Sequence, residues 1–255
     1  MHQLKHKDFI ETPLINLCRE VVASADSLED GIEFQAISAQ ILHSLFLQMT
    51  GAQEQKMKCI CWDLATEDYG YRYERFNRWD RGECSRLIDK NTVFGDVVRA
   101  IRKIKPAFKV FGSTPDKTLF FNNLCNQSKS LFVSSNLAKA YPEKYRQFED
   151  IVDKLDVNNI AAGDQQIFTG SDDDELDSIK PDHVLSATYS LLYKHRNRCA
   201  HNTLSYQQNI PTLDDFSDTI SQLYYNIFLF IAILFFIDEL SIRVYKQFQK
   251  AFNRI

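Results

Sequence analysis

The chain has 255 residues, of which 44% are apolar and 25% are charged, and its net charge is −4. These values are typical of a globular protein. The negative net charge excludes the class of proteins that bind nucleic acid through overall basicity, so any RNA-binding surface must be a local patch. The chain contains only eight glycines and six prolines, which favours helices over a turn-rich β architecture. We therefore expect an all-α fold, with residues 1–255 forming one large domain.

The cysteines and the N-terminus bear on redox state and location. Among the six cysteines, the only close pair is Cys59 and Cys61, and no second pair is present to complete a zinc site. We expect reduced thiols buried in helices. The first residues lack the apolar stretch of a signal peptide, so we expect a cytoplasmic protein.

Two helices are expected in the N-terminal third. Thr12 followed by Pro13 predicts a helix start, because proline is tolerated at the first helical position. A longer helix is expected from residue 34 to residue 64, since apolar residues recur there every three to four positions. Gly51 lies inside this segment and is expected to break or bend it. His43 is expected at the edge of the apolar face rather than as a metal ligand.

Residues 69–86 form the most basic part of the chain. Arginines recur there at every third position, interleaved with aromatic residues, at Arg72, Arg75, Arg78 and Arg81. Arginines beside exposed aromatic rings are suited to single-stranded RNA, because guanidinium groups bind phosphates and rings stack on bases. The alternative is a solvated helix face whose arginines pair with neighbouring acidic residues. Both interpretations stay open, and the first predicts that Arg72, Arg75 and Arg78 bind the RNA backbone.

The middle of the chain is less regular. A helix is expected to begin at Thr92 and to end at Pro106, since proline cannot continue it. Residues 106–181 are interpreted as an insertion, within which Pro142 begins another helix. The run of carboxylates at 171–177 is expected to be a flexible, solvated loop rather than a metal site.

The next predicted helix begins after Asp182, a suitable N-cap. Leu185, Tyr189 and Leu192 recur along it at the spacing of a buried stripe, and the following position of that stripe is Arg196. A buried guanidinium is costly unless an anionic or hydrogen-bonding group meets it. Arg196 is therefore the unusual residue of this helix.

The last helix is expected to run from about residue 213 to residue 252. Its centre, residues 227–237, has eleven residues without a polar side chain, fewer than the roughly 20 that cross a bilayer. A helix that is apolar on all sides is normally buried on all sides. We expect a twofold partner to supply part of that cover. A membrane-associated helix is the alternative interpretation.

Asn197 and His201 lie four positions apart, so in a helix they stack on one face beside Arg196. The string Arg-Asn-x-x-Ala-His that these residues form resembles the signature of the HEPN superfamily. The resemblance implies a helical-bundle domain that pairs as a homodimer, in which two motifs form one ribonuclease centre. It implies cleavage without metal or other cofactor, a cyclic phosphate product, and Arg196, Asn197 and His201 as catalytic residues. Arg198 lies close enough to contribute to RNA binding.

These residue types suit the attack of an RNA 2′-OH on the adjacent phosphate. Histidine can transfer protons near neutral pH, and arginine supplies fixed bidentate charge for the phosphoryl oxygens. Asn197 could orient His201 or bind phosphate. One subunit supplies a single motif histidine, whereas an acid and a base are two groups, and a twofold dimer would supply both.

The resemblance also implies partners, and alternatives remain beside it. HEPN proteins act as toxins, phage-defence effectors and CRISPR-associated ribonucleases, so the expected partners are RNA, a second copy of the chain, and an antitoxin or defence-system protein. Toxins silenced by a nucleotidyltransferase carry a tyrosine two positions after the histidine, where this chain has Thr203. The alternative function is a non-catalytic HEPN-like module that binds nucleotide or RNA or assembles with a partner. In that case His201 would cap its helix and Arg196 would form a structural ion pair.

Overall fold

The computed structural model describes residues 6–29, 31–76, 84–161, 165–170, 183–201 and 226–252. Within these ranges lie ten α-helices and a short 3-10 helix, η1, and no strand beyond one isolated antiparallel bridge between Ile160 and Phe168. The predicted all-α fold is confirmed. The helices are α1 (Lys7–Glu11), α2 (Leu14–Asp26), α3 (Ile32–Glu67), α4 (Tyr69–Phe76), α5 (Leu87–Ile104), α6 (Thr114–Phe132), α7 (Asn136–Ala140), α8 (Pro142–Lys154), η1 (Val157–Asn159), α9 (Val184–His201) and α12 (Ile227–Phe252).

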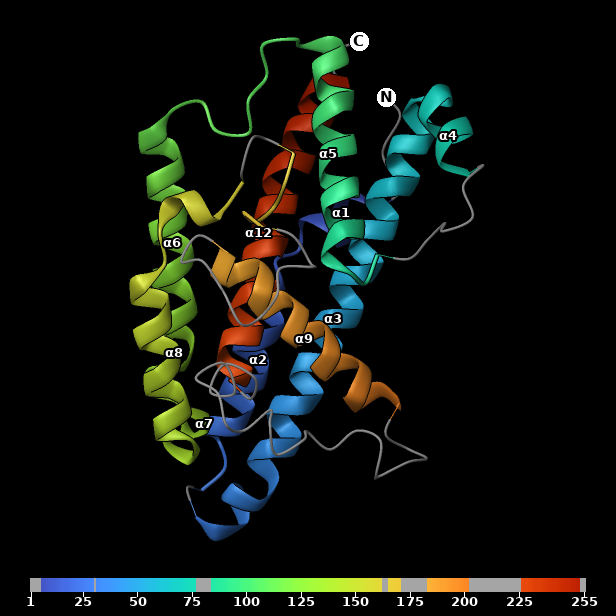
Figure 1. Cartoon of the computed structure of the whole chain (residues 1–255). Helices are drawn as coiled ribbons and strands as arrows, with labels where there is room; N and C mark the ends of the chain where they lie inside the picture. Colours follow the sequence, from blue (N-terminus) through green and yellow to red (C-terminus); the bar gives the residue numbers. More distant parts are fainter. Residues whose placement is uncertain are drawn as a thin grey trace.

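Helix α12 lies inside the bundle and contacts α2, α3, α5, α6, α8 and α9 (Figure 1). It begins at Ile227 because the Asn226 side chain caps it, with Asn226 Oδ1 accepting a hydrogen bond from the Leu229 amide at 3.2 Å. The Asn226 side-chain amide also donates to the Lys144 carbonyl of α8. In the described part of the chain the predicted last helix is interrupted at Asn226, and residues 213–225 of that prediction lie outside the described residues.

The apolar run of α12 is covered by the chain itself. Every residue from Phe228 to Ile237 is at most 2% exposed. The Phe228 ring packs edge-on against Phe132 of α6 with centroids 5.0 Å apart, and Ile231 lines a small cavity with residues of α2 and α6. The prediction that a twofold partner covers this run is therefore wrong, because neighbouring helices already surround it. Among the described helices, none has the length and apolar character of a membrane span.

Helix α3 runs without a break through Gly51, contrary to the predicted interruption. Gly51 is exposed, whereas Met49 and Gln53 on either side of it are buried, so tertiary packing keeps this turn helical despite the low helix propensity of glycine. Helix α2 begins at Leu14 with Pro13 as its N-cap, one residue later than the expected start at Pro13.

Local sequence signals predicted some, but not all, of the helix boundaries between residues 84 and 161. Helix α5 ends at Ile104, before Pro106 as expected, but begins at Leu87 rather than at Thr92. The earlier start is stabilised by Asp89, whose side chain accepts a hydrogen bond from the Arg86 amide at 3.3 Å. Helix α8 begins at Pro142 as predicted.

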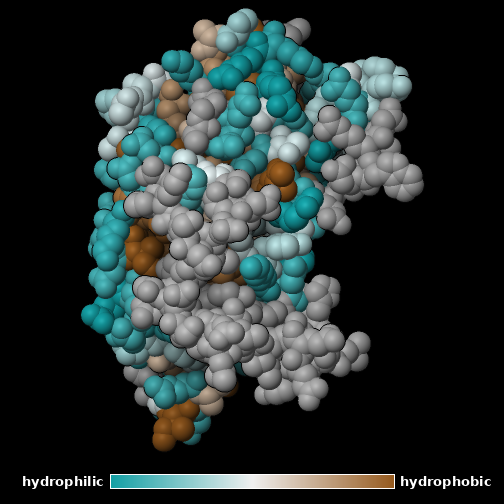
Figure 2. Space-filling view, in the orientation of Figure 1, coloured by the Kyte–Doolittle hydropathy of each residue, from teal (hydrophilic) through white to brown (hydrophobic). Residues whose placement is uncertain are grey.

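Residues 106–181, interpreted from the sequence as an insertion, contain α6, α7 and α8. These helices pack against α2, α3 and α12 and contribute to the same hydrophobic core (Figure 1). The acidic run at 171–177 lies outside the described residues. On the face drawn in Figure 2, the described surface is mostly hydrophilic, with small separate apolar patches.

A buried ion pair joins α3 to α12. Lys56 Nζ lies 2.7 Å from Asp238 Oδ1, and both side chains are at most 5% exposed. The other carboxylate oxygen of Asp238 accepts a hydrogen bond from the Leu14 amide at 2.7 Å, and Lys56 also donates to the Thr12 carbonyl. The start of α2 is thus held against the middle of α3 and α12.

We expect Lys56→Met to lower the free energy of unfolding by about 3–5 kcal/mol, because it leaves Asp238 buried without its cation. The measurement is urea unfolding followed by circular dichroism. Lys58→Met is the matched control, since Lys58 pairs with Glu54 near the surface and should contribute about 1 kcal/mol or less. Equal losses in the two variants would contradict a structural role for the buried pair.

Candidate nucleic-acid interface

Helix α9 carries the residues of the predicted motif and crosses α3 and α12 (Figure 1). Leu185, Tyr189 and Leu192 are buried, which confirms the predicted apolar stripe. Arg196, the next position of that stripe, is half-buried, with 28% of its side chain exposed. The stripe therefore reaches the surface at Arg196.

Arg196 has partners within its own chain. Its Nη2 donates to Glu54 Oε2 of α3 at 3.3 Å, and its Nη1 donates to Asn197 Oδ1 at 3.2 Å. Glu54 also accepts a hydrogen bond from Lys58 at 2.8 Å. Burial raises the pKa of Glu54, but the hydrogen bond from Lys58 and the nearby charges of Lys58, Arg196 and Lys90 outweigh it, so the pKa lies below the ordinary value. Glu54 is thus a carboxylate that holds the Arg196 guanidinium in place.

The sequence interpretation missed both Glu54 and Lys90. Glu54 lies on the polar side of a helix with no spacing relation to Arg196, so only packing brings them together. Lys90 lies before the predicted helix start at Thr92, in a segment without a recognisable pattern. The one available signal was a lysine between Ile88 and Val93, in a stretch that becomes the first turns of α5.

A small cavity lies beside the Glu54–Arg196 pair. It has an accessible volume of about 10 Å³, close to the space that one water molecule needs. Its walls come from α3, α5, α9 and α12 and include Thr50, Gln53, Glu54, Ser85, Lys90, Tyr189, Leu192, Tyr193, Arg196 and Leu234. The cavity is too small for a nucleotide, so any phosphate would reach Arg196 from the solvent side.

Lys90 lies in the wall of this cavity and is 2% exposed. Its ammonium donates to the Cys84 carbonyl and lies 5.8 Å from the centroid of the Tyr189 ring. Burial lowers the pKa of Lys90 to about 8, although the nearby Cys84, Glu54 and Asp89 oppose the shift. Lys90 is therefore a buried amine whose pKa lies well below the ordinary value of lysine.

His195, which precedes Arg196, faces the core. It is 8% exposed, and its ring lies 5.3 Å from Phe46 and 5.6 Å from Phe230, measured between centroids. His43 of α3 lies 5.5 Å from the same ring, is half-buried, and has its pKa lowered by burial. Both histidines pack within the bundle.

Of the predicted catalytic residues, the structure brings Arg196 and Asn197 together. His201 is the last residue of α9, but its side chain and that of Arg198 lie outside the described part of the chain. The backbone places His201 four positions after Asn197, the spacing at which two side chains of a helix are neighbours.

The predicted arginine stripe divides in the structure. Arg72 of α4 is exposed and lines a pocket with Trp62 of α3, whereas Arg75 is half-buried. Burial lowers the pKa of Arg75, but the nearby Cys61, Tyr71 and Asp96 together outweigh that effect and raise it. Arg78 and Arg81 lie outside the described residues. Only Arg72 of the described stripe is open to a ligand in solution.

We expect the free energy of unfolding to depend on pH through Lys90. The unfolded chain keeps this proton up to a pKa near 10.5 and the folded chain only to about 8, so the unfolded state binds more protons between those values. Stability should therefore rise with pH across this window, by up to about 1.4 kcal/mol per pH unit. The measurement is urea unfolding of the wild type and Lys90→Met at pH 7.5, 8.5 and 9.5.

Because other groups also titrate, the quantity that tests this expectation is the difference between the two proteins. Lys129→Met, which removes a surface lysine paired with Asp153, serves as the control and should parallel the wild type. Parallel curves for Lys90→Met and the wild type would show that Lys90 does not carry the pH dependence.

Comparison with protein-family models, curated proteins and solved structures found no match to the chain. The similarity to the HEPN superfamily rests on residues 196–201, whose sequence is Arg-Asn-Arg-Cys-Ala-His.

Proposed function

We propose that this protein is a metal-independent endoribonuclease of the HEPN type, acting in the cytoplasm as a toxin or anti-phage defence effector. The observation that carries the proposal is the position of Arg196. It continues a buried stripe of α9 but emerges at the surface with 28% of its side chain exposed, directly before Asn197 and five residues before His201. A cation held at that place can meet an RNA phosphate.

In this proposal each residue has a distinct role. Arg196 stabilises the negative charge that develops on the phosphorane, and His201 transfers a proton to or from the reacting oxygens. Glu54 is a positioning residue, since its hydrogen bond at 3.3 Å restricts the guanidinium before substrate arrives. Asn197 contacts Arg196 in the described structure and therefore orients the arginine.

The second proton-transfer group would come from a partner copy of the chain, as the HEPN resemblance implies. Because α12 is enclosed, such a dimer would have to form through another surface. The C-terminal end of α9 is the natural part of that interface, since it would bring two copies of the motif together. An antitoxin or defence-system protein would be a further partner.

One observation favours a second candidate function. Arg196 already has a carboxylate partner in Glu54 within its own chain. A guanidinium satisfied in this way can serve packing alone, and the motif would then belong to a non-catalytic module that binds RNA or nucleotide. Cleavage assays separate the two functions.

We expect Arg196→Ala and His201→Ala each to reduce RNA cleavage at least about 100-fold, because each removes a group that acts on the transition state. The assay is purified protein with total RNA in the presence of EDTA. Arg196→Lys should also lose most activity, since an ammonium cannot make the bidentate contact of a guanidinium. Arg146→Ala, which removes a surface arginine paired with Glu143, is the control.

Full cleavage by His201→Ala with EDTA present would show the catalytic assignment to be wrong. RNA binding without cleavage by the wild type would favour the non-catalytic module. Sedimentation of the same samples tests the dimer, because an active wild-type monomer would contradict a composite centre.

We expect replacement of Arg72, Arg75 and Arg78 by alanine to weaken RNA binding and to flatten its salt dependence. Each lost phosphate contact on a single strand should reduce the slope of log K against log salt by roughly 0.7. Arg72→Ala is measured beside the triple variant to show how much of the change comes from Arg72 alone. This comparison is needed because Arg75 is half-buried. An unchanged slope in both variants would leave these arginines as a solvated helix face.

A further inference from the structure

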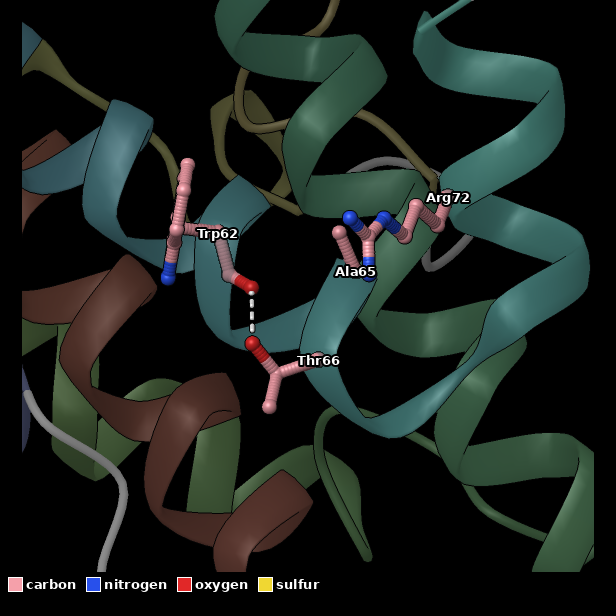
Figure 3. Close-up of a pocket in the computed structure, with 4 residues that line it drawn as sticks. All are labelled: Trp62, Ala65, Thr66 and Arg72. Carbon is pink, nitrogen blue, oxygen red and sulfur yellow. Dashed lines mark hydrogen bonds between the residues drawn. The ribbon is translucent and has the colours of Figure 1, made fainter.

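A pocket of about 320 Å³ lies where α3 meets α4, away from the cavity beside Arg196. The described residues that line it are Trp62, Ala65 and Thr66 from the end of α3 and Arg72 from α4. Figure 3 shows the Arg72 side chain extending toward Ala65, with the Trp62 indole on the other side of Ala65. The volume lies in the range of small-molecule sites.

The two ends of this pocket are chemically different. Trp62 leaves 56% of its surface exposed, which is unusual for the largest apolar side chain. Thr66 uses its hydroxyl to donate to the Trp62 carbonyl at 2.9 Å, so this hydroxyl is already bonded within α3. Trp62, Ala65 and Thr66 thus form an apolar surface, and Arg72 supplies a cation beside it.

Arg72 forms no ion pair with any described residue. Asp68, one turn before it, would be the natural partner, but its carboxylate is already bound by Lys103 of α5 and by the Tyr71 amide. The hydrogen bond from Lys103 is the largest of the effects on Asp68 and lowers its pKa, which keeps that carboxylate charged and engaged. Within the described part of the chain, no carboxylate therefore competes with an anion for the guanidinium of Arg72.

We infer that this pocket binds one nucleotide unit, with the base stacked on the Trp62 indole and the phosphate bound by Arg72. An indole face stacks on any base, and a guanidinium binds phosphate oxygens in pairs. The unit is either a free nucleoside monophosphate or one unpaired nucleotide of an RNA strand. The RNA case rests on the proposed ribonuclease function, whereas binding of a free nucleotide does not.

The position of the pocket along α3 fits an RNA strand that also reaches Arg196. Glu54, Lys58 and Trp62 are four residues apart in turn, so they follow one slowly winding stripe of the helix. Glu54, which holds Arg196, lies eight residues before Trp62, or about 12 Å along the helix axis. A strand at Arg196 that follows this stripe would place a neighbouring nucleotide in the pocket.

The test measures binding, not cleavage. AMP, adenosine and inorganic phosphate are titrated separately, with the fluorescence of Trp62 observed in a Trp79→Phe background, since the chain has two tryptophans. An all-deoxy single-stranded oligonucleotide, which lacks the 2′-OH and cannot be cleaved by this route, forms the second arm, with fluorescence anisotropy of a labelled strand as the readout. Circular dichroism verifies that each variant is folded.

Trp62→Ala and Arg72→Ala should each weaken AMP binding at least about fivefold. Because Trp62→Ala removes the fluorescent reporter, AMP binding to that variant is measured by competition with the labelled strand. Trp62→Phe should retain most of the affinity, because a ring remains for stacking. Adenosine should bind more weakly than AMP and be insensitive to Arg72→Ala. Arg146→Ala is the control for general loss of positive charge.

If AMP binding depends on both Trp62 and Arg72, the pocket is a free-nucleotide site. If only oligonucleotide binding depends on these two residues, the pocket is an RNA subsite. Binding of neither ligand, or binding that Trp62→Ala and Arg72→Ala leave unchanged, overturns the inference. Wild-type protein that binds AMP through Trp62 and Arg72 but does not cleave RNA would contradict the ribonuclease proposal alone. RNA cleavage by a protein that binds neither AMP nor the oligonucleotide through these two residues would contradict this inference alone.

Discussion

The buried ion pair between Lys56 and Asp238 is the interaction on which the arrangement of the long helices depends. Two charges enclosed in an apolar core are costly, and burial raises the pKa of Asp238 even though Lys56 and the Leu14 amide oppose the shift. The pair is tolerated because both carboxylate oxygens and the ammonium have hydrogen-bond partners. An apolar pair could fill the same space, but it would not specify the same register of α3 against α12.

Other polar contacts continue this seam between α3 and α12. The Gln53 side chain donates to the Leu234 carbonyl at 2.7 Å, and the Tyr245 hydroxyl donates to Asp63. Together with Lys56 they place polar groups along one face of α3 at 53, 56 and 63. These contacts fix the rotation of α3, and that rotation directs Glu54 toward Arg196 and leaves Trp62 at the surface.

The two candidate binding regions are therefore consequences of one helix orientation. Around Arg196 the surface is ionic, with a guanidinium held between Glu54 and Asn197. Around Trp62 it is mainly apolar, with Arg72 beside it. RNA presents both a charged backbone and apolar base faces, so a ligand of that kind can use both regions. The pairing of Arg196 with Glu54 also explains how a cation can continue an apolar stripe without an unmet charge.

The sequence by itself determined the features that depend on neighbouring residues. The all-α fold, the boundaries at Pro13, Pro106 and Pro142, and the buried stripe of α9 all follow from local sterics and helical periodicity. These signals act within a few turns of the chain, where spacing in sequence is equivalent to spacing in space.

Only the tertiary structure decided which helix meets which. It kept α3 helical through Gly51, enclosed the apolar run of α12, and brought Glu54 to Arg196 across 142 positions of sequence separation. It also buried Lys90 and placed Arg72 beside Trp62. The physical reason is that burial and ion pairing depend on surfaces contributed by distant segments, and a periodic pattern shows that a face is apolar without showing what covers it.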